Sequence, residues 1–211
     1  RDIMLAENTG ARLHIAHIST ARSIELVREA KQRGVKVTCE VTPHHLLLTE
    51  DACLGFDTNT KMKPPLRTEK DRLACLAALK DGTIDCIATD HAPHADFEKV
   101  REFDHAPFGI IGLETAFCAI YHHLVKPGQL SLARLAEALT IAPTRVLDLP
   151  PAELKAGHPA DLNLIDLEAS TTFTAESLLS KGKNTPWLDQ TLSGRVLCTF
   201  LEGRITWQDG A

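Results

Sequence analysis

The sequence predicts an α/β protein built on a parallel sheet, followed by a smaller unit of antiparallel β structure. Short apolar strands alternate with amphipathic helices through the first 150 residues, which is the pattern of a parallel sheet. The strands are apolar throughout, which is typical of a sheet covered on both faces. After about Pro150 the alternation of strands and helices stops, and the sequence pattern becomes that of antiparallel strands with a hairpin. We therefore predict two units, residues 1–150 and 151–211.

Capping and turn residues place the elements of the first unit. Ser19 or Thr20 provides the N-cap of a helix that stops at Gly34. Thr68, with an acidic residue three positions later, resembles a capping box. Two prolines within residues 61–67 exclude a helix or a central strand there. The expected elements are strands at 12–17, 35–41 and 84–89 and helices at 20–34, 68–82, 113–124 and 131–139.

Two stretches differ from this alternation. About twenty residues without clear periodicity follow residue 94, and a connection of that length inside a compact domain is typical of a functional loop or lid. In the second unit, residues 161–167 alternate loosely, and residues 195–207 predict a hairpin that turns at Glu202 and Gly203.

The composition excludes several classes of protein. Of 211 residues, 44% are apolar and 24% charged, and the net charge is −5. The chain has no apolar run long enough for a membrane span and no Lys/Arg cluster for nucleic acid. The six cysteines are scattered without a CxxC pair, which favours reduced thiols in a cytoplasmic protein. The chain opens at Arg1 inside what looks like a helix, so we expect a fragment.

The strongest chemical signal is the string Asp90–His94 (DHAPH) at the exit of the third strand. Active-site groups gather at the carboxyl ends of strands in parallel α/β proteins. Asp90 there can bind a metal or move protons, and two histidines follow within four residues. The alternative is an aspartate that caps the loop by accepting hydrogen bonds from backbone N–H groups.

Histidines elsewhere could complete a site. In an extended strand, residues three apart point to opposite faces, so His14 and His17 are not expected to share a ligand. His17 lies at the carboxyl end of its strand and is the better candidate, although a core or capping role is the alternative; His14 is expected to be structural. Catalytic zinc generally takes three protein ligands, and one of His44 and His45 could supply another donor.

Six strings in the chain resemble one family. HIAHIST, EVTPHHLLLTE, KMKPPLRTEKD, ATDHAPH, APFGIIGLETA and PADLNLID occur in order over nearly the whole sequence. Together they resemble the dihydroorotases of the bacterial class I type, in the amidohydrolase superfamily. The resemblance implies the C-terminal part of a (β/α)8 TIM-type barrel, strands six to eight, with a small β-sandwich appendage. A complete barrel needs about 250 residues.

The resemblance also implies roles for particular residues. His17 is expected to bind zinc, and Asp90 to bind zinc and act as the catalytic acid and base. His94 is expected to contact the substrate, as is the backbone of Phe108 and Gly109. One or two zinc ions are implied, with the remaining ligands upstream of this chain.

Three further positions bear on the resemblance. The family usually has Asn before the two prolines, where it touches the substrate, but this chain has Lys63. A lysine could still meet a carboxylate, but it lacks the paired donor and acceptor of an amide. His44 and His45 match a string that supplies no metal ligand in the family, which weighs against them.

The implied reaction is the reversible closure of N-carbamoyl-L-aspartate to L-dihydroorotate, a step of pyrimidine synthesis. The expected partners are this small-molecule substrate and either a second copy of the chain or an aspartate carbamoyltransferase. Two alternatives stay open. One is a related cyclic amidase, an allantoinase or hydantoinase, which the Lys63 departure favours. The other is a non-catalytic dihydroorotase-like subunit, which would have lost its metal-binding and acid–base residues.

Overall fold

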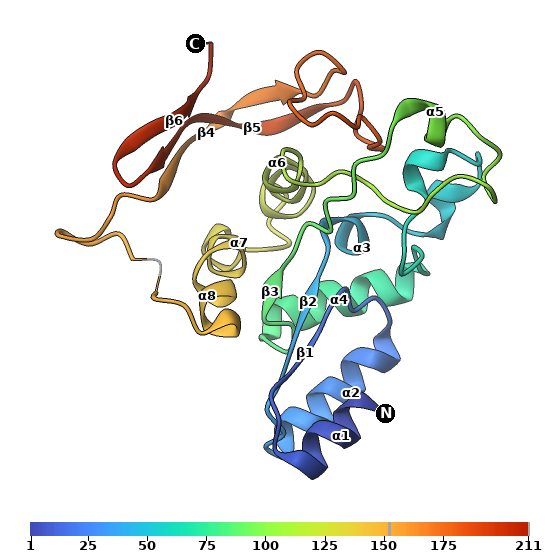
Figure 1. Cartoon of the computed structure of the whole chain (residues 1–211), viewed down its shortest axis with the longest axis vertical. Coiled ribbons are helices and arrows are strands. Elements are labelled where there is room, and N and C mark those ends of the chain that lie inside the picture. Colours follow the sequence, from blue (N-terminus) through green and yellow to red (C-terminus); the bar gives the residue numbers. More distant parts are fainter. Residues whose placement is uncertain (152, 211) are drawn as a thin grey trace.

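The computed structural model describes residues 1–151 and 153–210, which form two three-stranded sheets with helices packed around the first (Figure 1). Residues 152 and 211 belong to the predicted second unit and lie outside the described residues. The elements are α1 (Asp2–Thr9), β1 (Leu13–Ile15), α2 (Ala21–Gln32), β2 (Val37–Val41), α3 (Pro43–Leu47), η1 (Glu50–Cys53), η2 (Thr58–Thr60), α4 (Glu69–Asp81), β3 (Cys86–Ile87), α5 (Asp96–Lys99), α6 (Ala116–Ile120), η3 (Tyr121–Val125), α7 (Leu132–Leu139), α8 (Ile141–Leu147), β4 (Leu162–Thr172), β5 (Thr191–Leu201) and β6 (Arg204–Gln208).

The first sheet is parallel, in the order β1-β2-β3, as the strand–helix alternation predicts. Its outer strands are shorter than expected, because the regular ladder is confined to Leu13–Ile15 and Cys86–Ile87. Two backbone hydrogen bonds to β2 lie beyond these strands, from Ile18 N to Glu40 O and from Ala88 N to Val41 O. The carboxyl ends of the three strands therefore stay side by side.

The predicted helix caps at Thr20 and Thr68 are confirmed, and Ser131 provides a third cap that was not predicted. The side chains of Thr20, Thr68 and Ser131 accept hydrogen bonds from backbone N–H groups in the first turns of α2, α4 and α7. The helix expected at residues 113–124 is instead α6 followed by η3, a π-helical turn. Helix α8 was not predicted. It begins directly after α7, with only Thr140 between the two helices.

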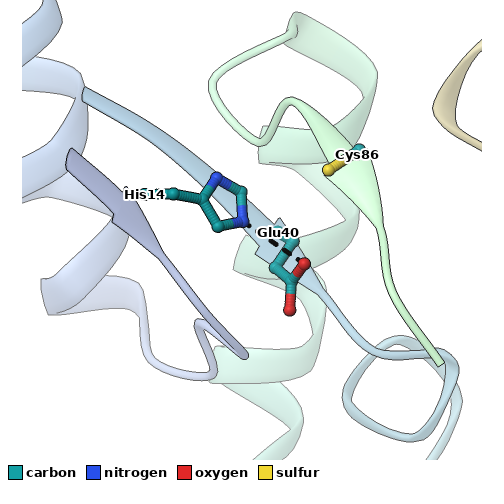
Figure 2. A group of neighbouring side chains, drawn as sticks. All are labelled: His14, Glu40 and Cys86. Carbon is teal, nitrogen blue, oxygen red and sulfur yellow. Dashed lines mark hydrogen bonds and ion pairs between the residues drawn. The ribbon is translucent and has the colours of Figure 1, made fainter. Parts of the chain in front are cut away.

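The parallel sheet has one apolar and one polar face. Alternate residues of β2, namely Val37, Cys39 and Val41, are buried in a core shared with α2, α4 and α7. The other face carries Thr38 and Glu40, which are half-buried. The expectation of apolar cover on both faces is therefore wrong for this face. Figure 2 shows polar or sulfur-bearing side chains on all three adjacent strands, His14, Glu40 and Cys86.

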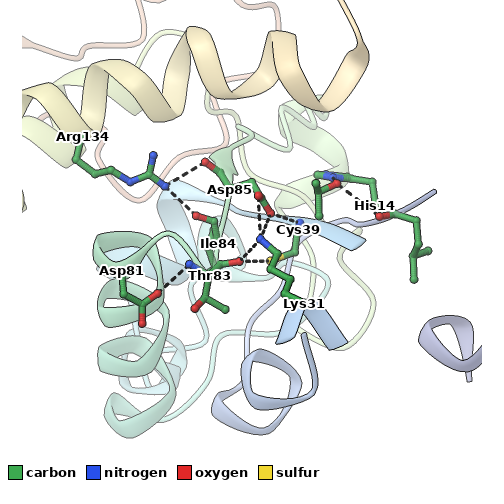
Figure 3. Close-up of polar contacts among 10 residues, drawn as sticks. His14, Lys31, Cys39, Asp81, Thr83, Ile84, Asp85 and Arg134 are labelled. Atoms are coloured by element: carbon green, nitrogen blue, oxygen red, sulfur yellow. Dashed lines mark hydrogen bonds and ion pairs between the residues drawn. The ribbon is translucent and has the colours of Figure 1, made fainter. Parts of the chain in front are cut away.

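A polar network ties the amino-terminal end of the sheet to its helices (Figure 3). Lys31 of α2 donates to both carboxylate oxygens of Asp85 at 2.8 Å. Asp85 also accepts from the backbone N–H of Cys39 on β2 at 2.8 Å. Arg134 of α7 donates to the carbonyls of Ile84 and Asp85 at 2.8 and 3.1 Å. These contacts fix the start of β3 between two helices, at the end of the sheet opposite to Asp90.

The second sheet is antiparallel, in the order β4-β5-β6, with the predicted turn at Glu202 and Gly203. It packs beside α6 (Figure 1), where Cys118, Trp187 and Leu192 belong to a second apolar core. The six cysteines are all free thiols. Among the described residues, no helix has the length and apolar character that crossing a membrane requires.

We predict that Lys31→Met lowers the free energy of unfolding by about 2 kcal/mol, because Asp85 loses a charged partner in a half-buried place. Urea unfolding of the purified protein measures this loss. The matched control is Lys36→Met, at an exposed position nearby, which is expected to change stability by less than about 0.5 kcal/mol. Equal effects of the two substitutions would contradict a special role for the Lys31–Asp85 pair.

Candidate functional site

The structure brings two predicted ligands, His17 and Asp90, together at the carboxyl ends of β1 and β3. Nε2 of His17 lies 3.6 Å from Oδ1 of Asp90. Both side chains are only partly exposed, at 28% and 27%. An imidazole nitrogen and a carboxylate oxygen thus face each other across the end of the sheet.

Both residues adopt a backbone conformation that is uncommon for side chains other than glycine. His17 has φ 55° and Asp90 has φ 47°. Such left-handed residues are a few per cent of non-glycine positions, and they cluster at active sites, where the surrounding structure holds them. Here His17 lies two residues after the end of β1 and Asp90 three residues after the end of β3, so each left-handed residue stands in the turn that follows its strand. The two side chains meet at these turns.

Glu40 of β2 lies beneath His17. Its Oε1 is 2.9 Å from Nδ1 of His17, at ion-pair distance but without the alignment of a hydrogen bond. The contact with Glu40 raises the pKa of His17, desolvation opposes it, and the charge of Asp90 adds to it. Burial alone would raise the pKa of Glu40. The contacts with His17 and His14 lower this pKa by more, so it lies below its ordinary value. A carboxylate therefore holds the Nδ1 side of the ring while Nε2 faces Asp90.

His14 and His17 contact different oxygens of one carboxylate, which the expectation of opposite faces did not foresee. Nε2 of His14 lies 3.3 Å from Oε2 of Glu40 (Figure 2), while His17 faces Oε1 of the same side chain. The opposite-face rule holds only for an extended strand, and His17 has left it. Nδ1 of His14 also pairs with Thr38 Oγ1 at 2.8 Å, as expected for a structural histidine.

The group His14, Glu40 and Cys86 offers three ligand atoms within 4.8 Å of one another. Metals bind the thiolate form of cysteine. Burial, with the nearby charge of Glu40, raises the pKa of Cys86 to about 12. The thiol therefore stays protonated at neutral pH, and we interpret this group as support for the site rather than as a metal centre.

The donors at His17 and Asp90 fit a zinc centre. Zinc binds imidazole nitrogen and carboxylate oxygen at about 2.0–2.2 Å in tetrahedral geometry, so two donors of one ion are about 3.4 Å apart. The observed separation is 3.6 Å. Nδ1 of His17 faces Glu40, which is the second contact that metal-binding histidines usually have.

The predicted substrate-contact residues form a second group beside this pair. Nε2 of His94 lies 2.9 Å from Phe108 O, so the ring contacts the backbone of the second predicted segment. Gly109 N donates to Lys61 O, and Gly109 O accepts from Lys99 Nζ. The backbone N–H of Phe108 donates to none of the described residues.

Three lysines surround this segment. Lys63, which replaces the Asn of the family, is exposed, and its Nζ lies 6.0 Å from the centre of the Phe108 ring. Lys61 is buried and donates to the carbonyls of Phe103 and Asp104. Lys99 is buried and donates to the carbonyls of Pro107 and Gly109, and burial lowers its pKa to about 8. The two buried lysines thus fix the loop by donating to its backbone carbonyls at four positions.

His44 and His45 lie in α3 and not beside Asp90. His45 pairs with Thr42 Oγ1 and Pro64 O. His44 is 0% exposed and stacks on Trp187, with ring centroids 5.4 Å apart. Neither ring nitrogen of His44 makes a well-aligned hydrogen bond within the described chain. Both histidines are therefore packing residues. This agrees with the family resemblance, in which the matching string supplies no metal ligand.

Sequence reasoning missed Glu40, Lys61, Lys99 and Asn184. Glu40 carried a signal, since it is an acidic residue in a strand of otherwise β-branched and apolar residues. The lysines carried none, because nothing local distinguishes a buried lysine from an exposed one. Asn184 contacts residues about ninety positions earlier, which no local pattern reveals.

Comparison with known proteins shows the family to which the chain belongs. Residues 2–206 match the amidohydrolase family, so the chain belongs to it. The dihydroorotase of Brevibacillus brevis is 51% identical over 99% of this chain and 49% of its own length. That of Bacillus subtilis is 49% identical over 100% of this chain and 49% of its own length. The chain thus spans about half the length of the curated relatives it matches.

Solved structures agree on the α/β fold. The L-hydantoinase (dihydropyrimidinase) from Arthrobacter aurescens superimposes with a TM-score of 0.92 at 28% identity, over 100% of this chain and 48% of its own. A D-hydantoinase (dihydropyrimidinase) from Thermus sp. gives a TM-score of 0.90 at 25% identity, over 99% of this chain and 47% of its own.

We predict that His44→Phe makes stability less sensitive to acid. Burial lowers the pKa of His44 to about 3, the charge of His45 adds to the lowering, and the backbone of Ile111 opposes it. The unfolded chain binds this proton near pH 6.5, so stability is lost as the pH falls from about 6.5 toward 3, by about 2 kcal/mol at pH 5. Phe keeps the stack on Trp187 and has no such proton.

Urea unfolding at pH 7.5 and pH 5 measures the effect, with His158→Phe at an exposed position as the control. The expected result is a smaller loss of stability on acidification for His44→Phe than for the parent and the control. Equal losses in all three proteins would contradict the prediction.

Proposed function

We propose that this chain forms part of a zinc-dependent dihydroorotase, which interconverts N-carbamoyl-L-aspartate and L-dihydroorotate in pyrimidine synthesis. The observation that carries the proposal is the 3.6 Å approach of His17 and Asp90 at the carboxyl end of a parallel sheet. Curated relatives named dihydroorotase, about 50% identical over the whole chain, favour this substrate.

The same proposal assigns the architecture. Strands β1, β2 and β3 correspond to strands six, seven and eight of a (β/α)8 barrel, since each is parallel to the next and joined to it through helices. Residues 1–150 would be the C-terminal part of this barrel. Residues 151–211, which include the antiparallel β4-β5-β6 sheet, would supply part of a β-sandwich.

His17 and Asp90 would hold the zinc, through Nε2 and Oδ1. Zinc, when bound, lowers the pKa of a water molecule and polarises the ring carbonyl of the substrate. Glu40 keeps Nδ1 of His17 engaged, so Nε2 is the nitrogen turned toward the centre. Four residues of this chain thus have distinct roles. His17 and Asp90 would bind the zinc, and Glu40 and His14 would support these two ligands.

Asp90 would be the acid and base of the reaction. In the hydrolytic direction its carboxylate accepts the proton of the attacking water and then delivers it to the leaving ring nitrogen. One carboxylate can do both, because it is a base in the first half and an acid in the second. Ring closure follows the same path backwards, with Asp90 accepting the proton from the carbamoyl nitrogen.

The group around His94 would bind the substrate's carboxylate and amide. The backbone N–H of Phe108 makes no hydrogen bond to the described residues. We therefore assign it as the backbone donor to the substrate. Lys63 is exposed beside the Phe108 ring and would meet a carboxylate as a cation. The loop of residues 95–111 would shield the reaction from bulk water.

A hydantoinase or allantoinase is the second candidate, favoured by Lys63 in place of Asn and by the structural similarity to the L-hydantoinase. A non-catalytic subunit is disfavoured because His17, Asp90 and His94 are all present. The test uses the protein expressed from its full gene, with zinc, assayed on dihydroorotate, hydantoin and allantoin. Preferred turnover of dihydroorotate supports the proposal, and preferred turnover of either other amide would replace it.

We predict that Asp90→Asn lowers turnover of dihydroorotate at least about 100-fold, since the amide cannot accept and return the proton. Circular dichroism is expected to match the parent, because Asn also tolerates a left-handed backbone. Asp104→Asn, in the exposed part of the loop, is the control and is expected to keep parental turnover. Near-parental turnover of Asp90→Asn would refute the assigned role.

We predict that Glu40→Gln weakens zinc binding about 10- to 100-fold, the range typical of losing a residue that orients a ligand histidine. Competition with a chromophoric chelator measures the zinc Kd without any need for turnover. Glu29→Gln, on the exposed face of α2, is the control. An unchanged Kd for a folded Glu40→Gln protein would show that His17 does not need this carboxylate.

A further inference from the structure

Asn184 lies in the segment between β4 and β5, in the predicted second unit, yet its side chain binds the site loops. It is 3% exposed. Its Oδ1 accepts from the backbone N–H of His94 at 3.0 Å. Its Nδ2 donates to Ala92 O at 2.9 Å and to Gly109 O at 3.0 Å. One amide therefore connects the strand-exit loop that carries His94 with the segment that carries Gly109.

The backbone of Asn184 extends the same connection. Its carbonyl accepts from Ile111 N at 3.0 Å, and the two loops also pair directly, from Ala92 N to Ile110 O at 3.1 Å. Every hydrogen of the Asn184 side-chain amide is donated and its oxygen accepts, so the residue has little freedom to bind anything else.

Two glycines allow this close packing. A Cβ on Gly182 would lie 2.7 Å from His94 N and 2.8 Å from Asn184 Oδ1. A Cβ on Gly109 would lie 2.7 Å from Ala92 Cβ and 2.9 Å from His94 Nε2. All four distances are shorter than side chains tolerate, so the three segments pack together without room for a side chain at either glycine.

We propose that Asn184 is a positioning residue for substrate binding, which holds His94 and the Phe108–Gly109 backbone in the geometry that receives the substrate. This rests on the proposed function, because the substrate contacts are those assigned above. It makes substrate affinity depend on a side chain from the second predicted unit. Zinc binding does not depend on it, since none of the contacts of Asn184 involves His17, Glu40 or Asp90.

The test compares Asn184→Asp with the parent, both expressed from the full gene and loaded with zinc. Aspartate keeps the shape and the acceptor, but it cannot donate to Ala92 O and Gly109 O. We expect KM to rise at least about tenfold, as for a buried hydrogen-bond partner that is removed. We expect kcat to change less than about threefold and zinc content to stay at the parental value. Asn163→Asp is the control, because Asn163 is exposed on β4 and only accepts a hydrogen bond there from Thr199 of β5, and its KM is expected to be parental.

A second variant, Asn184→Ser, removes the same donors without adding a charge, and the same rise in KM is expected. A parental KM in both folded variants would overturn the proposal. A joint loss of zinc and kcat would overturn it too, because Asn184 would then support the whole site. If neither variant folds, Asn184 is a stability residue and the proposal is wrong.

Hydrogen exchange separates this inference from the proposed function. The backbone amide of His94 is expected to exchange at least about tenfold faster in Asn184→Ser than in the parent, because the shorter side chain no longer supplies its acceptor, with no change in Asn163→Asp. Unchanged exchange would overturn the positioning role. A parent protein that turns over none of the cyclic amides would contradict the proposed function alone, since the exchange measurement needs no substrate.

Discussion

His17 and Asp90 meet because the chain leaves two parallel strands through left-handed residues. The residues with φ 55° and φ 47° lie in the turns just beyond β1 and β3, where their Nε2 and Oδ1 atoms are 3.6 Å from each other. A non-glycine residue in this region costs of order 1–3 kcal/mol, so the surroundings must hold it there. Glu40 supports the pair from the middle strand.

The two ends of the parallel sheet serve different purposes. At the amino-terminal end, Lys31 pairs with the Asp85 carboxylate and Arg134 donates to backbone carbonyls, so the network joins helices to strands. At the carboxyl end lie the polar groups of the proposed site, His17 and Asp90. The stabilising network thus lies away from the proposed site, as is usual in parallel α/β folds.

Local patterns predicted the order of strands and helices and the caps at Thr20 and Thr68, because caps depend on neighbours within one turn. The pairing of His17 and Asp90 came from the family resemblance, because no local pattern joins residues from two strands that are not neighbours in the sheet. The shared contact of His14 and His17 with Glu40 was not predicted, because His17 lies beyond the end of β1, where the alternation of an extended strand no longer applies. Asn184 stayed hidden because its partners lie about ninety residues earlier, where only tertiary packing brings them together.

The most direct test is anomalous diffraction at the zinc edge from crystals of the protein expressed from its full gene. Zinc bonded at about 2.0–2.2 Å to His17 Nε2 and Asp90 Oδ1, in one centre of one or two ions, is the predicted result. Zinc that is held without these two side chains, or that is coordinated by only one of them, would contradict the account.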